Sequence, residues 1–132
     1  GTMPLTHGVQ HVGLAVSNLE ESAAFFTDLL GWQEVKRRDD YPAIFVKDGA
    51  VMLTLWKTQT EEPIQFNRKN NVGLHHLALQ VETKEGLYQI LEVLKANQVE
   101  IEFEPTLLRE GPSMHMMCYE PSGIRVEFYY PG

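Results

Sequence analysis

Basic residues and cysteines are both scarce in this chain. It has 11 Lys and Arg against 18 Asp and Glu, which gives a formal charge of −7. Because binding to phosphate backbones needs a basic face, we expect no nucleic-acid partner. The two small basic clusters, Arg37–Arg38 and Arg68–Lys69, lie beside acidic or amide residues. They are interpreted as solvated loop residues; the alternative is an anion-binding site. Cys118 is the only cysteine, so no intrachain disulfide can form and a reducing cytoplasm is the expected location.

Long apolar runs are also absent. No stretch approaches the roughly 20 apolar residues needed to cross a bilayer, and no segment resembles a signal peptide, so we expect no membrane partner. The Gly-Thr dipeptide before Met3 resembles a cloning remnant and is not expected to contribute to the fold. The 132 residues, 43% apolar and 22% charged, predict one globular domain with its own core.

An internal repeat is the strongest pattern in the sequence. "HVGLAVSNLEESAAFFTDLL" from His11 aligns with "HLALQVETKEGLYQILEVLK" from His76. Each copy begins with alternating apolar residues and continues with apolar residues at helical spacing, which predicts a strand followed by a helix. Ser17 and Glu20 have the spacing of a capping box, and Thr83 is the predicted N-cap of the second helix.

Turn signals divide the rest of each half into strands. The predicted helices end near Gly31 and Asn97. Asp-Gly within "AIFVKDGAVMLTLW" and "EPSG" within "MHMMCYEPSGIRVEFYY" each separate two β-rich runs. The predicted fold is α+β, with two βαβββ modules at 9–57 and 73–130, a linker at 58–72, and one domain spanning 1–132. We expect mixed sheets that curve around a central pocket, with the helices outside.

Alternation along the strands separates two faces of each predicted sheet. Large apolar residues on one face suit packing under a helix. The other face carries histidine, acid and small side chains, which predicts a pocket. Its predicted members are His11, Gly13, Ala15, Met52, Thr54, Trp56, His76, Ala78, Gln80, Arg125, Glu127 and Tyr129. His75 falls on the opposite face from His76, where we expect a backbone partner; the alternative is that it orients a neighbouring group.

The quoted repeat, "HHLALQV" and "EPSGIRVEFYY" together resemble the vicinal oxygen chelate superfamily over residues 9–130. That superfamily includes glyoxalase I, fosfomycin-modifying thiol transferases, extradiol dioxygenases and bleomycin-resistance proteins. "EPSG" is similar to the family's acidic-Pro-acidic-Gly turn, with Ser122 in place of the second acid. The turn precedes the strand that carries a ligand glutamate in the family.

The resemblance implies metal ligands at His11, Thr54, His76 and Glu127, of which only Thr54 has unsuitable chemistry. Two imidazoles and one carboxylate can hold one divalent ion (Fe, Mn, Zn, Ni or Co) and leave positions open for substrate. Such an ion would act as a Lewis acid on adjacent oxygens of a small molecule. The alternative is a degenerate scaffold with unused histidines.

Departures from the family patterns bear on the reaction. Thr54 stands where glyoxalase I has a fourth ligand, which weighs against glyoxalase activity. Gly13 stands where fosfomycin enzymes commonly have Thr, and their substrate-binding Arg would fall beyond Gly132. The three-ligand set is similar to that of the dioxygenases. His115 is predicted to face the pocket beside Glu127 as a general acid or base, or else to be a water-exposed rim residue.

Two function classes therefore remain. The first is a metal-dependent lyase, transferase or dioxygenase acting on a small molecule with vicinal oxygens. The second is a non-catalytic drug-binding or metabolite-binding protein of the bleomycin-resistance type. Open sheet edges predict a homodimer, with modules paired within or between chains. The residues predicted to line the pocket are Gly13, Met52, Thr54, Trp56, Gln80 and Tyr129.

Overall fold

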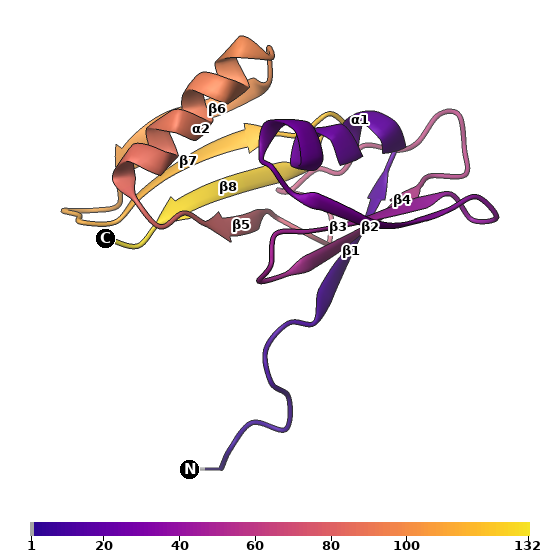
Figure 1. The fold of residues 1–132 in the computed structure, drawn as a ribbon, viewed down its shortest axis with the longest axis horizontal. Helices are drawn as coiled ribbons and strands as arrows, with labels where there is room; N and C mark the ends of the chain where they lie inside the picture. Colours follow the sequence, from indigo (N-terminus) through magenta and orange to yellow (C-terminus); the bar gives the residue numbers. More distant parts are fainter. Residues whose placement is uncertain (1) are drawn as a thin grey trace. The chain divides into compact units, whose positions relative to one another are not determined.

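The structure, a computed structural model, describes residues 2–132 and divides into two compact units that meet in sequence between Gln59 and Thr60. Each unit has the element order βαβββ (Figure 1), as the repeat predicts. The first contains β1 (His11–Val16), α1 (Leu19–Ala24) with its π-helical continuation η1 (Phe25–Leu29), β2 (Gln33–Arg38), β3 (Ala43–Lys47) and β4 (Met52–Lys57). The second contains β5 (Leu77–Gln80), α2 (Lys84–Ala96), β6 (Glu100–Leu107), β7 (Met114–Tyr119) and β8 (Arg125–Tyr130).

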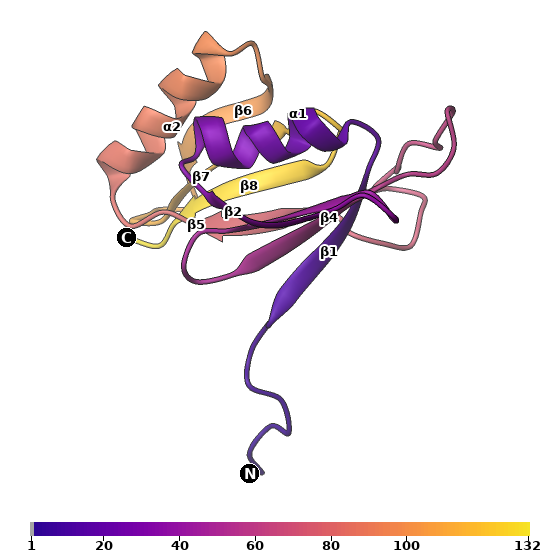
Figure 2. The ribbon, with the colours of Figure 1, turned by 45° about the vertical axis from the view of Figure 1, so that its right-hand side comes forward.

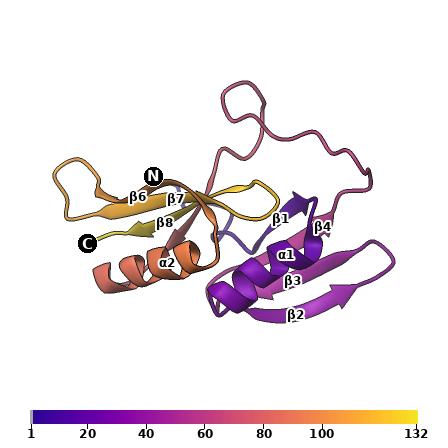
Figure 3. The same ribbon diagram turned by 90° about the horizontal axis from the view of Figure 1, so that it is seen from above.

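The two sheets have equivalent strand orders, β1-β4-β3-β2 and β5-β8-β7-β6. In each, the first and last strands pair in parallel and the remaining pairs are antiparallel. Within its own unit, each helix lies along one face of the sheet (Figures 2 and 3). The mixed sheets and the two helices confirm the predicted fold class. Within residues 2–132, no helix has the length and apolarity that a membrane crossing requires.

The core of each unit lies between the helix and the sheet. In the first unit, α1 packs against β3 and β4, and η1 packs against β2. In the second, α2 packs against β6, β7 and β8. Burying each large apolar side chain stabilises the fold by about 1.5–3 kcal/mol. The buried residues include Leu14, Val16, Phe26, Leu53 and Leu55 in the first unit, and Leu87, Leu91, Leu94, Val126 and Phe128 in the second.

Both predicted turns form, and acidic side chains close them. The Oδ1 atom of Asp48 accepts hydrogen bonds from the backbone N–H groups of Ala50 and Val51, at 2.8 and 2.9 Å. Glu120, which is 2% exposed, accepts from the N–H groups of Ser122 and Ile124 at 2.7 and 3.0 Å. The acid of "EPSG" is therefore a buried turn residue that sets the approach of the chain to β8.

The two helices begin differently. Thr83 caps α2 as predicted, because its Oγ1 accepts the N–H of Gly86 at 2.9 Å. The predicted Ser17–Glu20 capping box is wrong, since α1 begins one residue later with Asn18 at the N-cap. The Glu20 carboxylate instead pairs with Arg37 at 2.5 Å.

Candidate functional site

Glu127 is the centre of the polar face of the second unit. Its neighbours along β8, Val126 and Phe128, are buried on the α2 side, so alternation directs Glu127 to the other face. The side chain is nevertheless only 7% exposed. Its Oε1 lies 3.3 Å from Nε2 of His76, and its Oε2 lies 2.5 Å from Nδ1 of His115. The two carboxylate oxygens therefore face two different imidazoles.

Strand pairing explains why these three residues converge. Glu127 stands opposite Ala78 on β5 and Met117 on β7. His115 is two residues before Met117 on the same face of β7, and its ring lies 4.8 Å from the ring of Phe103 on β6. Because Ala78 is small, it leaves the carboxylate open on the β5 side. The structure thus brings together His76, His115 and Glu127, all predicted to share a face.

His75 and His76 do not point to opposite faces, contrary to the prediction. Strand β5 begins only at Leu77, so alternation does not apply to the pair. Their Nδ1 atoms are 2.8 Å apart and their ring centroids 5.0 Å apart. Nδ1 of His75 also lies 3.3 Å from Nη1 of Arg125. The pKa of His75 is lowered, first by desolvation and then by the positive charge of Arg125, so a neutral ring is favoured.

Arg125 is itself fixed by Glu102 of β6. Its Nε and Nη2 donate to the two oxygens of Glu102 at 2.9 and 2.8 Å, which makes a bidentate ion pair. Tyr119 donates its hydroxyl proton to Oε1 of Glu102 at 2.5 Å, and Arg68 donates to that hydroxyl oxygen at 3.2 Å. These contacts, led by the hydrogen bonds from Arg125, lower the pKa of Glu102 to about 2.

Arg68 lies in a loop, as expected, but its side chain is half-buried rather than fully solvated. Its side chain is 31% exposed and contacts both Tyr119 and Glu102, the latter at 3.8 Å. Periodicity does not identify Arg68 because the residue lies in an irregular segment, outside any strand. Arg37 and Arg38 lie on strand β2 rather than in the expected loop. Both form ion pairs with exposed acids, and Arg38 also lies near the ring of Trp56.

His11 is the first residue of β1, the position equivalent to the start of the repeat at His76. It is exposed, and its Nδ1 contacts the side-chain amide oxygen of Gln10. An amide oxygen only accepts hydrogen bonds, so a neutral His11 in this contact carries its proton on Nδ1. That tautomer keeps a lone pair on Nε2, the nitrogen with which a metal could be bound.

The hydroxyl group of Thr54 forms a hydrogen bond with Trp56. Thr54 is 3% exposed, and its Oγ1 accepts the indole N–H of Trp56 at 2.9 Å. Gly13 stands opposite Thr54 on β1, where a Cβ atom would lie only 3.2 Å from that Oγ1. Glycine at this position therefore allows the hydroxyl and the indole to lie close to β1. The hydroxyl of Thr54 positions Trp56.

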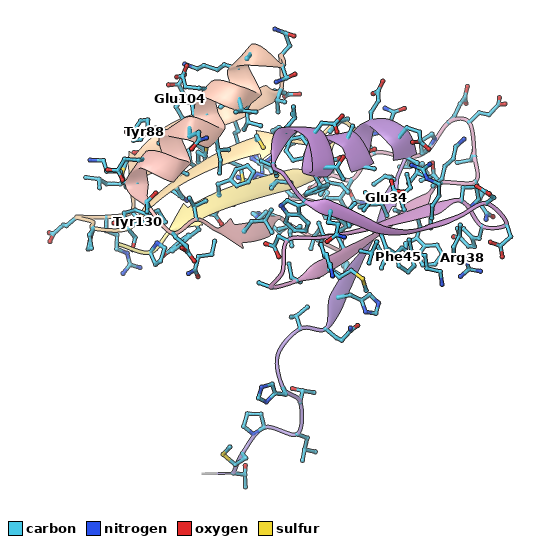
Figure 4. The ribbon with its side chains drawn as sticks, in the orientation of Figure 1. Glu34, Arg38, Phe45, Tyr88, Glu104 and Tyr130 are labelled. Carbon is cyan, nitrogen blue, oxygen red and sulfur yellow. The ribbon has the colours of Figure 1, made fainter. Side chains whose placement is uncertain are left out.

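Aromatic side chains surround Trp56 within the first unit. The ring centroids of Tyr41 and Phe45 lie 5.1 and 5.7 Å from that of Trp56. The guanidinium of Arg38 lies 5.9 Å from the indole centroid. Arg38 and Phe45 are labelled in Figure 4. Of the other residues predicted to line a pocket, Met52 is half-buried opposite His11, while Gln80 and Tyr129 stand opposite each other on β5 and β8.

The donor set of the second unit fits part of a metal site. Two ligands bound about 2.1 Å from one ion at right-angle to tetrahedral geometry are about 3.0–3.4 Å apart. The 3.3 Å between Nε2 of His76 and Oε1 of Glu127 falls in that range. Among residues 2–132, no three His, Cys, Asp or Glu side chains form a group that could hold a metal by themselves. A site at this pair therefore needs a further ligand.

Sequence patterns did not reveal the ion-pair cluster of Glu102 and Arg125. Alternation places Arg125 on the face of Glu127, which is the only signal for it. Glu102 could not be assigned to a face because β6 shifts register against β7 between Ile101 and Phe103 and again before Thr106. The short His75–His76 contact was missed for a related reason, namely that the strand begins later than the apolar pattern predicts.

Comparisons with known proteins agree with this architecture. Residues 8–128 match the model of the Glyoxalase/Bleomycin resistance protein/Dioxygenase superfamily. A structure of a glyoxylase/bleomycin resistance protein/dioxygenase domain from Frankia sp. EAN1pec superposes with a TM-score of 0.84 at 23% identity, covering 96% of this chain and 99% of that one. At this identity the likeness shows the fold alone.

Two characterised relatives match at the sequence level. The manganese-dependent 2,3-dihydroxybiphenyl 1,2-dioxygenase of Geobacillus genomosp. 3 is 26% identical over 120 residues, 91% of this chain but 35% of that protein. The trivalent organoarsenical cleaving enzyme of Bacillus sp. (strain MD1) is 28% identical over 122 residues, 91% of this chain and 71% of that protein. The chain thus spans about a third of the length of the dioxygenase. With a family match over residues 8–128, the chain belongs to the Glyoxalase/Bleomycin resistance protein/Dioxygenase superfamily.

Proposed function

We propose that this protein is a metal-dependent enzyme acting on a small molecule with two oxygens on neighbouring atoms, by dioxygenase-like, lyase or transferase chemistry. The observation that supports this most directly is the approach of His76 Nε2 to Glu127 Oε1 at 3.3 Å. An imidazole nitrogen and a mostly buried carboxylate oxygen held at ligand spacing are an arrangement that a divalent cation stabilises.

His76 and Glu127 would hold the ion, with His11 as the third ligand, supplied by the same chain or by a second copy. When bound, a divalent ion supplies Lewis-acid stabilisation of negative charge on the substrate oxygens. His115 engages Glu127 through Nδ1, so only its Nε2 would accept or donate a proton during the reaction. Thr54 would take no part in coordination because its hydroxyl accepts the indole N–H of Trp56.

The names of the relatives support the substrate class. 2,3-Dihydroxybiphenyl carries hydroxyl groups on adjacent carbons, and the dioxygenase named for it is manganese-dependent. Adjacent oxygens can occupy two open positions of one ion, which three protein ligands leave available. Manganese is accordingly the first ion to test, ahead of Fe, Zn, Ni and Co.

Catechol and resorcinol provide a direct test, since they are isomers that differ only in whether the two hydroxyls are adjacent. We expect catechol to bind the Mn²⁺-loaded protein at least about tenfold more tightly than resorcinol, a difference of about 1.4 kcal/mol. After removal of metal with a chelator, the preference should vanish. Isothermal titration calorimetry measures all four affinities.

The rival function is binding of a small molecule without chemistry. The aromatic cluster of Tyr41, Phe45 and Trp56 favours it, because clustered rings can hold an apolar or aromatic ligand without a metal. Equal affinities for the two isomers, unchanged by the chelator, would support the binding protein and contradict the enzyme.

A further inference from the structure

The hydrogen-bond network behind His76 determines which of its two ring nitrogens carries the proton. We infer that His75, fixed by Arg125, is a positioning residue that holds the proton of His76 on Nδ1 and so keeps the Nε2 lone pair directed at Glu127. This inference rests on the proposed metal site, because the tautomer of His76 matters only if its Nε2 is a ligand.

The Arg125 side chain can only donate hydrogen bonds. An arginine guanidinium has five N–H donors, no acceptor, and no accessible neutral form. Its Nη1 lies 3.3 Å from Nδ1 of His75, so that nitrogen must be unprotonated for the contact to be favourable. Glu102 holds the guanidinium from the other side through Nε and Nη2, which prevents Arg125 from turning away.

The contact with His75 constrains the protonation of His76 in turn. Its Nδ1 lies 2.8 Å from Nδ1 of His75, a hydrogen-bond distance that requires one proton between the two nitrogens. Because Arg125 keeps Nδ1 of His75 unprotonated, the proton belongs to Nδ1 of His76. The lone pair on Nδ1 of His75 then accepts two hydrogen bonds, a long one from Arg125 and a short one from His76.

The other ring nitrogen of His76, Nε2, faces Glu127. A neutral imidazole with its proton on Nδ1 has a lone pair on Nε2. That lone pair faces Oε1 of Glu127 at 3.3 Å, and Oε1 is itself an acceptor. Two acceptors facing each other need a cation or a proton between them. Oε2 cannot swing in to relieve the contact, because it is held by Nδ1 of His115 at 2.5 Å.

Two adjacent histidines thus have one combined role. His76 would bind the ion, and His75 would hold its tautomer and ring orientation. Outer partners of metal-bound histidines are usually carboxylates or backbone carbonyls, and losing one typically lowers metal affinity 10–100-fold. Here a second imidazole, itself oriented by the Arg125–Glu102 pair, takes that place.

The tautomer can be read without any metal present. Long-range ¹H–¹⁵N correlation spectra of the ¹⁵N-labelled, chelator-treated full chain report which nitrogen of each neutral histidine carries the proton. We expect His76 to be protonated on Nδ1 and His75 on Nε2. A His76 ring protonated on Nε2 would overturn the inference, whatever the metal affinity.

Metal titrations of two His75 variants provide the second arm. His75→Phe keeps a flat ring but has no acceptor, and should weaken Mn²⁺ binding about 10–100-fold. His75→Asn places a carbonyl oxygen near the Nδ1 position and should restore affinity to within about threefold of the wild type. Equal Mn²⁺ affinity in His75→Phe and wild type would overturn the inference and leave the proposed function standing. Absence of Mn²⁺ binding in the wild type and in His76→Ala alike would contradict the proposed function itself.

Discussion

At the scale of single residues, the contact with His115 determines how the carboxylate of Glu127 is oriented. Nδ1 of His115 holds Oε2 of the carboxylate at 2.5 Å, which leaves Oε1 on the side of His76. We therefore expect His115→Ala to lower Mn²⁺ affinity about 10–100-fold, because the freed carboxylate can rotate. Mn²⁺ titration followed by electron paramagnetic resonance measures the effect.

The control for this prediction is His115→Asn, whose amide can still donate to the carboxylate and should retain more of the affinity than the alanine variant. If His115 acts only in proton transfer, both variants will bind Mn²⁺ like the wild type. That result would contradict the role of His115 in holding Glu127.

Glu102 gives a pH-dependent prediction at the same scale. The hydrogen bonds from Arg125 lower its folded-state pKa to about 2, below its ordinary value of 4.5. A carboxyl group with a lowered folded pKa stabilises the protein above its unfolded pKa, and the contribution is lost as the pH falls through the folded pKa. Glu102→Gln should therefore cost about 1–3 kcal/mol of unfolding free energy at pH 7. The difference from wild type should shrink between about pH 4.5 and pH 2.

Urea denaturation of both proteins at a series of pH values from 7 to 2.5 checks this prediction. A difference in unfolding free energy that stays constant over the whole range would show that the charge of Glu102 contributes nothing to stability.

At the scale of elements, the two helix starts form a matched pair. Thr83 caps α2 through the N–H of Gly86, whereas Ser17 lies one residue before the N-cap of α1. Thr83→Ala should destabilise the protein by about 1 kcal/mol, while Ser17→Ala should change it by less than about 0.5 kcal/mol. Thermal and urea unfolding of the two variants measure the difference. Equal destabilisation by both would indicate a capping role for Ser17 after all.

Regular periodicity accounts for what could be predicted of the elements. Strand alternation correctly separated Val126 and Phe128 from Glu127, since their burial depends on a period that is visible in sequence. Irregular backbone accounts for what was missed. Because β5 begins only at Leu77, the rings of His75 and His76 can contact each other. Glu102, which contacts Arg125, lies within the first register shift of β6. Neither feature has a signature in residue periodicity.

At the scale of the whole molecule, assembly remains a prediction. Each sheet ends in outer strands, β1 and β2 in one unit and β5 and β6 in the other, and such edges favour pairing with further strands. We expect a homodimer, so sedimentation equilibrium should give twice the chain mass of 15.1 kDa. A mass of one chain at micromolar concentration and above would contradict this expectation.

The reaction is the least predictable property at this scale, because the same fold hosts several chemistries. The superfamily follows from motifs that span most of the chain. The choice among dioxygenase, lyase and transferase depends on side chains that differ between members. Thr54 illustrates this, since its contact with Trp56 explains why it would not be a ligand but says nothing of the substrate.

The central claim is that His76 and Glu127 bind a divalent cation, and Mn²⁺ titration of the chelator-treated chain tests it most directly. The wild type should bind one Mn²⁺ per chain, and both His76→Ala and Glu127→Gln should lose that binding by at least about 100-fold. Glu104→Gln is the matched control, because Glu104 is 59% exposed, pairs only with Lys95 among the ion pairs of residues 2–132 and lies outside the candidate site (Figure 4). Glu127→Gln binding Mn²⁺ as tightly as Glu104→Gln would contradict the account.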